Sequence, residues 1–227
     1  MVGRARITIA FAVAVWVSMT LALTGCGGSG TGHQRAAGTG QGLTKAKAET
    51  VKLKDLSAQT SAALKDLLND PQRDLKPQYK TFATALSKLS ALAQKTRDRN
   101  MAIQAQLDKY LDTWREQVGT IQDTSLRDKA LERIAQAKES FKKLSTELSQ
   151  VKESISPYVA NLKDIQKYLD TDLTPAGLKA ISEMATKALG YDQEINARLD
   201  GAIAEFDRVA EELTAGPQRQ KAAGANP

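Results

Sequence analysis

Apolar residues recur at alternating gaps of three and four along most of this chain, and this spacing constrains the fold more than any other feature. Between Ala130 and Leu169 it continues unbroken, with Phe141, Leu144 and Leu148 at its centre. A period near 3.5 residues places these side chains in a narrow seam on one face of an α-helix and favours supercoiled packing of helices. We therefore expect an all-α fold, an elongated antiparallel bundle of four helices with coiled-coil packing.

Helix start and stop signals divide the chain into these four helices. Asp70-Pro71 predicts the end of the first helix, and Pro77 lies in the first turn of the second. Ser125 and Asp128 form a capping pattern before the third, and Thr174 is expected to cap the fourth. Short connections make neighbouring helices antiparallel. The predicted helices span about 45–69, 75–118, 125–170 and 174–214.

Several residues interrupt the seams. Thr96 and Asn100 lie on the second seam, either as a buried polar layer that fixes the register or at a bend that exposes both to water. We prefer the bend. Asp192 lies on the fourth seam just after Gly190, where a kink is expected to turn the carboxylate outward. Pro157 is expected to bend the third helix, because it removes a backbone hydrogen bond.

Trp114 lies on the second seam near the end of its helix. It is either an anchor for a ligand or partner, or part of the packing between helices. We prefer packing, because large aromatic side chains dominate buried contacts.

The amino-terminal segment has the features of a removable export signal. Arg4 and Arg6 precede the apolar stretch 7–23, which ends in Leu-Thr-Gly-Cys26. An uncleaved membrane helix is the alternative, and length alone leaves it open, because a spanning helix usually needs about 20 predominantly apolar residues and this stretch has 17. The L-T-G-C ending resembles a bacterial lipobox, which implies cleavage before Cys26 and attachment of lipid, including palmitate, to that cysteine. We therefore assign residues 1–25 to a lipoprotein signal peptide.

The remaining chain divides into three parts by composition. Residues 26–43 are predicted to be the lipidated Cys26 followed by a flexible Gly-rich linker, which contains the only histidine, His33. Residues 44–215 form the predicted helical domain, and residues 216–227 a disordered tail. Gly27 stands where an aspartate often marks inner-membrane retention. In a host with two membranes we therefore expect the outer membrane, with the domain facing the periplasm.

Charge and residue usage exclude several function classes. Five of the 32 basic residues lie outside Thr44–Ala215, which leaves 27 against 26 acidic residues inside it. Such a balance with interspersed signs is typical of solvated helix surfaces and not of nucleic-acid binding. No cysteine or histidine lies within 44–215, which excludes Ser-His-Asp catalysis and ordinary zinc sites in that part of the chain. We expect no enzyme activity, no catalytic residue, no cofactor and no metal site.

A set of short motifs between Asp74 and Leu213 resembles a known family. They are Asp74-Leu75 with Tyr79, Trp114-Arg115-Glu116, Ser125-Leu126-Arg127, Pro157 before Leu162-Lys163-Asp164, Tyr168-Leu169 with Leu173, and Leu189-Gly190. In this order and spacing the chain resembles the bacterial lipoprotein family catalogued as domain-of-unknown-function two-nine-five-nine. The segment Asp170–Pro175 departs from the basic-polar stretch of that family. The resemblance implies an exported all-helical lipoprotein and implies no activity.

Two functions fit these observations. The first is a non-catalytic scaffold or protein-interaction module in the cell envelope, held to the membrane by the lipid on Cys26 and bound to a protein partner. The second is a helical carrier or binder of an apolar ligand such as lipid. A large apolar cavity would favour the carrier, and a closed core with an exposed apolar groove would favour the scaffold.

Overall fold

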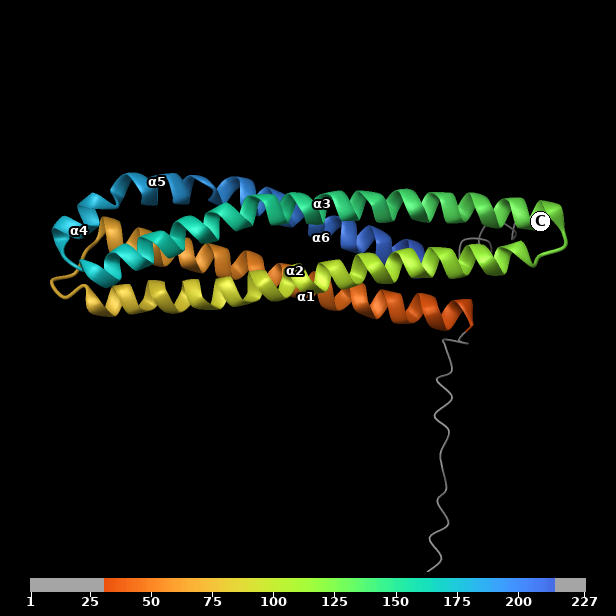
Figure 1. The fold of residues 1–227 in the computed structure, drawn as a ribbon, viewed down its shortest axis with the longest axis horizontal. Coiled ribbons are helices and arrows are strands. Elements are labelled where there is room, and N and C mark those ends of the chain that lie inside the picture. The colour runs from red at the N-terminus through yellow and green to blue at the C-terminus, as the bar shows by residue number, and fades with distance from the viewer. Residues whose placement is uncertain (1–30, 215–227) are drawn as a thin grey trace, which may run out of the picture.

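The structure is a computed structural model that describes residues 31–214, and every regular element in this range is a helix (Figure 1). The predicted signal peptide 1–25, the lipid-attachment residue Cys26 and the tail 216–227 lie outside the described residues. The elements are α1 (Gly32–Asn69), α2 (Lys76–Gly119), α3 (Thr124–Thr171), α4 (Pro175–Ala180), α5 (Ser182–Gly190) and α6 (Asp192–Thr214).

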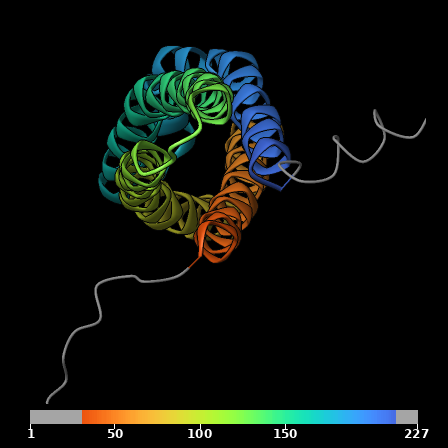
Figure 2. The same cartoon turned by 90° about the vertical axis from the view of Figure 1, so that its right-hand side faces the viewer.

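Four long helices form an antiparallel ring. α1 packs on α2 and α6, and α3 packs on the same two helices from the opposite side, while α5 continues the line of α6 along α3. Figure 2 shows the ring end-on. At about 1.5 Å per residue the 48 residues of α3 give a rod of roughly 72 Å. The expected elongated all-α bundle is confirmed.

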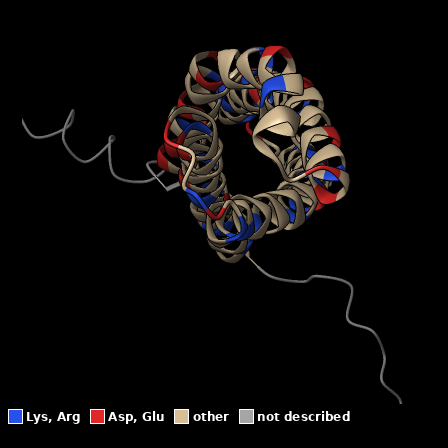
Figure 3. Ribbon diagram, turned by 90° about the vertical axis from the view of Figure 1, so that its left-hand side faces the viewer, with Lys and Arg blue, Asp and Glu red and all other residues tan. Residues whose placement is uncertain are grey.

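The apolar seam of the third predicted helix forms much of the core. Phe141, Leu144 and Leu148 are buried, and the same spacing continues through Leu162 and Ile165. Seams of the other helices meet it, so that one continuous cluster runs through the bundle. Basic and acidic residues are interspersed along the helices (Figure 3), while the buried cluster between the helices is apolar, so apolar packing is the main force that holds the helices together.

The first helix begins earlier than predicted. We expected a flexible linker up to residue 43, whereas residues 32–43 are helical. Thr31 and Gln34 form a capping box, in which Gln34 Oε1 accepts from Thr31 N at 2.9 Å. Leu43 is buried against the core, and Gly42 allows close packing because a Cβ there would lie 2.9 Å from Ile103 Cδ1. Contacts with α2 therefore override the poor helix propensity of glycine.

The ends of the later helices differ in detail from the prediction. Asp123, and not Ser125, caps α3, because its carboxylate accepts from Leu126 N at 2.8 Å. Thr174 caps the next helix as predicted. The predicted fourth helix consists of α4, α5 and α6, with the expected break after Gly190 and a further turn at Ile181. Pro157 lies inside α3 without ending it, and α3 changes direction along its length in Figure 1.

No helix within residues 31–214 is long and apolar enough to cross a lipid bilayer.

Candidate functional site: a groove between α2 and α3

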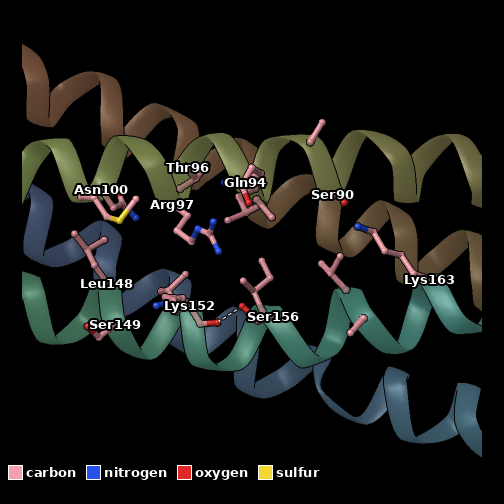
Figure 4. Close-up of a pocket in the computed structure, with 18 of the residues that line it drawn as sticks. Ser90, Gln94, Thr96, Arg97, Asn100, Leu148, Ser149, Lys152, Ser156 and Lys163 are labelled. Atoms are coloured by element: carbon pink, nitrogen blue, oxygen red, sulfur yellow. Dashed lines mark hydrogen bonds between the residues drawn. The ribbon is translucent and has the colours of Figure 1, made fainter.

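A groove of about 750 Å³ runs along the contact between α2 and α3 (Figure 4). Its floor contains aliphatic side chains of α3, among them Val151, Ile155 and Val159, while small and polar residues form its rims. Along α3 it extends from Leu148 to Lys163, which is roughly 22 Å at about 1.5 Å per residue. The space is therefore long and narrow, and its volume lies within the range of about 300–1,000 Å³ that is common for ligand sites.

Thr96 and Asn100 lie in the wall of this groove, and the prediction that a bend exposes them to water was wrong. Thr96 is 2% exposed and Asn100 is 8% exposed. Thr96 Oγ1 and Asn100 Oδ1 have no hydrogen-bond partner within the described part of the chain. A buried polar atom without a partner costs about 1–3 kcal/mol. The two unpartnered oxygens therefore lower the stability of the fold, and a role in binding would explain why they are buried at the groove.

All the charged residues that line the groove are basic. Arg97 extends from α2 across the gap towards α3, where Lys152 lies (Figure 4). Lys163 lies further along α3, and the residues that line the groove include no aspartate or glutamate. Arg97 approaches only Asp98, at 3.9 Å. Within residues 31–214 no carboxylate lies within ion-pair distance of Lys152 or Lys163, so these two lysines give the groove positive charge that no ion pair balances.

A second polar cluster joins three helices inside the bundle. Asp192, which was predicted to turn outward, instead accepts hydrogen bonds from Ser61 and, at 3.2 Å, from Lys65 of α1. The buried Tyr158 hydroxyl of α3 is bonded to Ser61 Oγ at 2.5 Å. The outward prediction for Asp192 was wrong because the break at Tyr191 brings the start of α6 beside α1. Burial raises the pKa of Tyr158. With its polar atoms mutually bonded, this cluster holds the bundle together.

Trp114 packs at the edge of the core, as the preferred interpretation predicts. Its ring lies 5.8 Å from the ring of Tyr110, and the Arg133 guanidinium lies 5.5 Å above it. Burial raises the pKa of Tyr110. No group of three or more histidine, cysteine, aspartate or glutamate residues in 31–214 is arranged to hold a metal ion.

Sequence reasoning did not propose the groove as a site. Thr96 and Asn100 are spaced four residues apart on an otherwise apolar seam, with Arg97 between them. That pattern is a signal for a buried polar pair beside a cation. This pattern does not predict the gap between α2 and α3, because the gap depends on how two separate helices pack.

Comparison with known proteins identifies the family. The family of proteins of unknown function DUF2959 matches residues 43–213. The match begins well before Asp74, the first of the motifs that carried the resemblance, and so includes most of α1. A search of curated proteins found no match. The family therefore spans the four-helix ring and the groove, and the chain belongs to DUF2959, the family that its motifs indicated.

Proposed function

We propose that this protein is a non-catalytic helical scaffold of the bacterial cell envelope, anchored to the membrane by lipid on Cys26. In a host with two membranes the anchor lies in the outer membrane and the rod faces the periplasm. The rod binds a protein partner, and neither nucleic acid nor a cofactor has a part in this function. The observation that carries the proposal is the position of the start of α1, the described element that follows Cys26 in the sequence, at one end of the rod.

Cys26 is joined to one end of the rod by a short stretch of chain. Five peptide units separate it from Thr31, and they reach at most about 16–18 Å. A hydrogen bond between Arg35 and Gln117 sets the start of α1 beside the end of α2. The α2–α3 turn therefore lies near the anchored end, while the α1–α2 connection and α4 lie at the opposite end (Figure 1). A rod held in this way reaches roughly 70 Å from its attachment point.

The end distant from the anchor exposes apolar side chains suited to a protein contact. Tyr168 near the end of α3 is 43% exposed, and Met184 of α5 is 45% exposed. Tyrosine is enriched in interface hot spots, and methionine adapts to differently shaped surfaces. Exposed apolar side chains also lie elsewhere on the rod, Met101 and Leu126 among them, and we place the partner at Tyr168 and Met184 because these two lie far from the proposed anchor.

Site-specific photo-crosslinking in intact cells tests this proposal. A crosslinking amino acid at Met184 should capture a defined protein, identified by mass spectrometry. The matched position Lys142 is also exposed but lies on the side of the rod, and should capture much less. Capture of the same protein with equal yield from both positions, or no protein adduct at Met184 or Tyr168, would contradict a partner site at the distant end.

The anchor has its own test. Cys26→Ala removes the only thiol that the proposed lipid can modify. We expect the variant to lose labelling by palmitate and to retain its signal peptide, as judged by mass. Normal palmitate incorporation in this variant would refute the lipid anchor, and fractionation of the wild type to the inner membrane of a two-membrane host would refute the outer-membrane location.

The groove supports a second candidate function, binding of a lipid or other apolar ligand. Its aliphatic floor is what an acyl chain needs. Its polar walls and positive charge differ from the purely apolar cavity expected of a general carrier, which points to a more selective ligand.

A further inference from the structure

We propose that the groove between α2 and α3 binds a single-chain lipid with an anionic head group, such as an anionic lysophospholipid. This inference rests on the second candidate function and specifies its ligand. It does not depend on the scaffold function, because the residues that line the groove on α2 and α3 lie within 90–104 and 148–163, apart from Tyr168 and Met184.

The shape of the groove selects an extended chain. An extended acyl chain is thin and can lie along Val151, Ile155 and Val159, where it would bury apolar surface of the groove floor. The length of the groove and its continuous aliphatic floor therefore suit a single acyl chain.

The charge of the groove selects an anion. Arg97 of α2 and Lys152 of α3 both line the groove, and the lining residues include no carboxylate. Guanidinium groups bind phosphate with two parallel hydrogen bonds, and ammonium groups add positive charge. A head group placed between Arg97 and Lys152 leaves the chain free to run towards Lys163 over the aliphatic floor.

The unpartnered polar atoms select a ligand that also donates hydrogen bonds. Asn100 Oδ1 accepts only, and Thr96 Oγ1 both donates and accepts. Both lie within one helical turn of Arg97, but their oxygens have almost no accessible surface, so the hydroxyl of a glycerol attached to a phosphate at Arg97 reaches them only when α2 and α3 move apart on binding. A lysophospholipid supplies the anion, the hydroxyl and the single chain in this order. Binding would satisfy two buried groups that the protein alone leaves unsatisfied.

Photo-crosslinking with two matched lipids tests the assignment. The full lipidated chain in vesicles of zwitterionic phosphatidylcholine receives lysophosphatidylglycerol with a diazirine in its acyl chain, or lysophosphatidylcholine with the same chain. After irradiation the labelled peptides are mapped by mass spectrometry. We expect the anionic probe to label peptides from 90–104 and 148–163, and the zwitterionic probe to label them about five-fold less, because each screened charge contact contributes modestly.

Two variants and one control separate binding from folding. Arg97→Gln with Lys152→Gln should lower labelling by the anionic probe to the level of the zwitterionic probe. Lys142→Gln with Lys143→Gln removes the same charge from exposed positions outside the groove, and labelling should not change. Thr96→Val keeps the volume but removes the unpartnered hydroxyl. It should raise the urea midpoint of unfolding and still lower labelling, a combination that damage to the fold cannot produce.

The other outcomes have distinct meanings. Equal labelling of the groove by both probes would overturn the anionic assignment and leave lipid binding intact. Labelling confined to other peptides would overturn both the assignment and the second candidate function. Competition by glycerol phosphate as strong as that by unlabelled lysophosphatidylglycerol would show a site for the anion alone and overturn the lipid assignment. Capture of an acidic protein segment at 90–104 in cells, without lipid, would overturn it in favour of a protein partner.

Discussion

Leu144 provides the most direct residue-scale test of the core. It is 0% exposed and lies at the centre of the longest seam. We expect Leu144→Ala to lower the free energy of unfolding by about 2–5 kcal/mol, because the truncation loses apolar burial and leaves a cavity. Lys142→Ala and Lys143→Ala on the exposed side of α3 should change it by less than about 0.5 kcal/mol. Urea unfolding with unchanged slope measures both. An unchanged midpoint for Leu144→Ala would mean that the seam is not the core.

Glu49 should make stability depend on pH. Burial opposes its charged form, but hydrogen bonds from Lys95 at 2.9 Å and Arg99 at 2.6 Å outweigh this and lower its pKa below 4.5. A carboxyl group with a depressed folded-state pKa stabilises the fold above its unfolded-state pKa, and this contribution is lost as pH falls through the folded value. The Glu49→Gln variant should therefore have a lower free energy of unfolding than wild type at pH 7. This difference in unfolding free energy should shrink below about pH 4.5.

Urea unfolding between pH 2 and pH 7 provides the measurement for Glu49. Glu116→Gln removes the same negative charge at an exposed position and serves as the control. A difference between Glu49→Gln and wild type that stays constant down to pH 2 would show that the ion pairs with Lys95 and Arg99 do not stabilise the fold.

At the scale of the element, the start of α1 offers the sharpest test. Gly38 and Gly40 lie inside the helix with open space around the position of a Cβ. Gly38→Ala and Gly40→Ala should each raise the free energy of unfolding by about 0.8–1.0 kcal/mol, the difference in helix propensity. Gly42→Ala should raise the free energy of unfolding by less than this or lower it, because the added Cβ would press on Ile103. If residues 32–43 were a tether outside the folded unit, none of the three substitutions would change the urea midpoint.

The same element shows where sequence reasoning succeeds and where it does not. The seam of α3 was predictable because burial of Phe141 and Leu144 follows from spacing along one helix. The helical state of 32–43 was not, because local propensity favours a linker and the close approach of Gly42 to Ile103 depends on a different helix, α2. Asn100 was placed on the seam correctly, but whether it lies in a closed core or beside a groove depends on the separation of α2 from α3. The spacing of apolar residues predicts which face of a helix is buried, but it does not predict how far that helix lies from the next one.

For the whole molecule, the shape in solution tests the ring of long helices. A thin rod of about 72 Å has a radius of gyration of roughly 21 Å, and the width of the bundle adds slightly to it. A globular domain with the same number of residues has a radius of gyration of about 16 Å. Small-angle X-ray scattering on residues 31–214 should therefore give a radius of gyration close to that of the rod and a pair-distance distribution with an extended tail. Circular dichroism of the same sample should show almost only helix. A radius of gyration close to that of a globular domain would mean that the helices fold back on themselves. The two ends of the rod would then lie close together, which would remove the basis for the proposed scaffold.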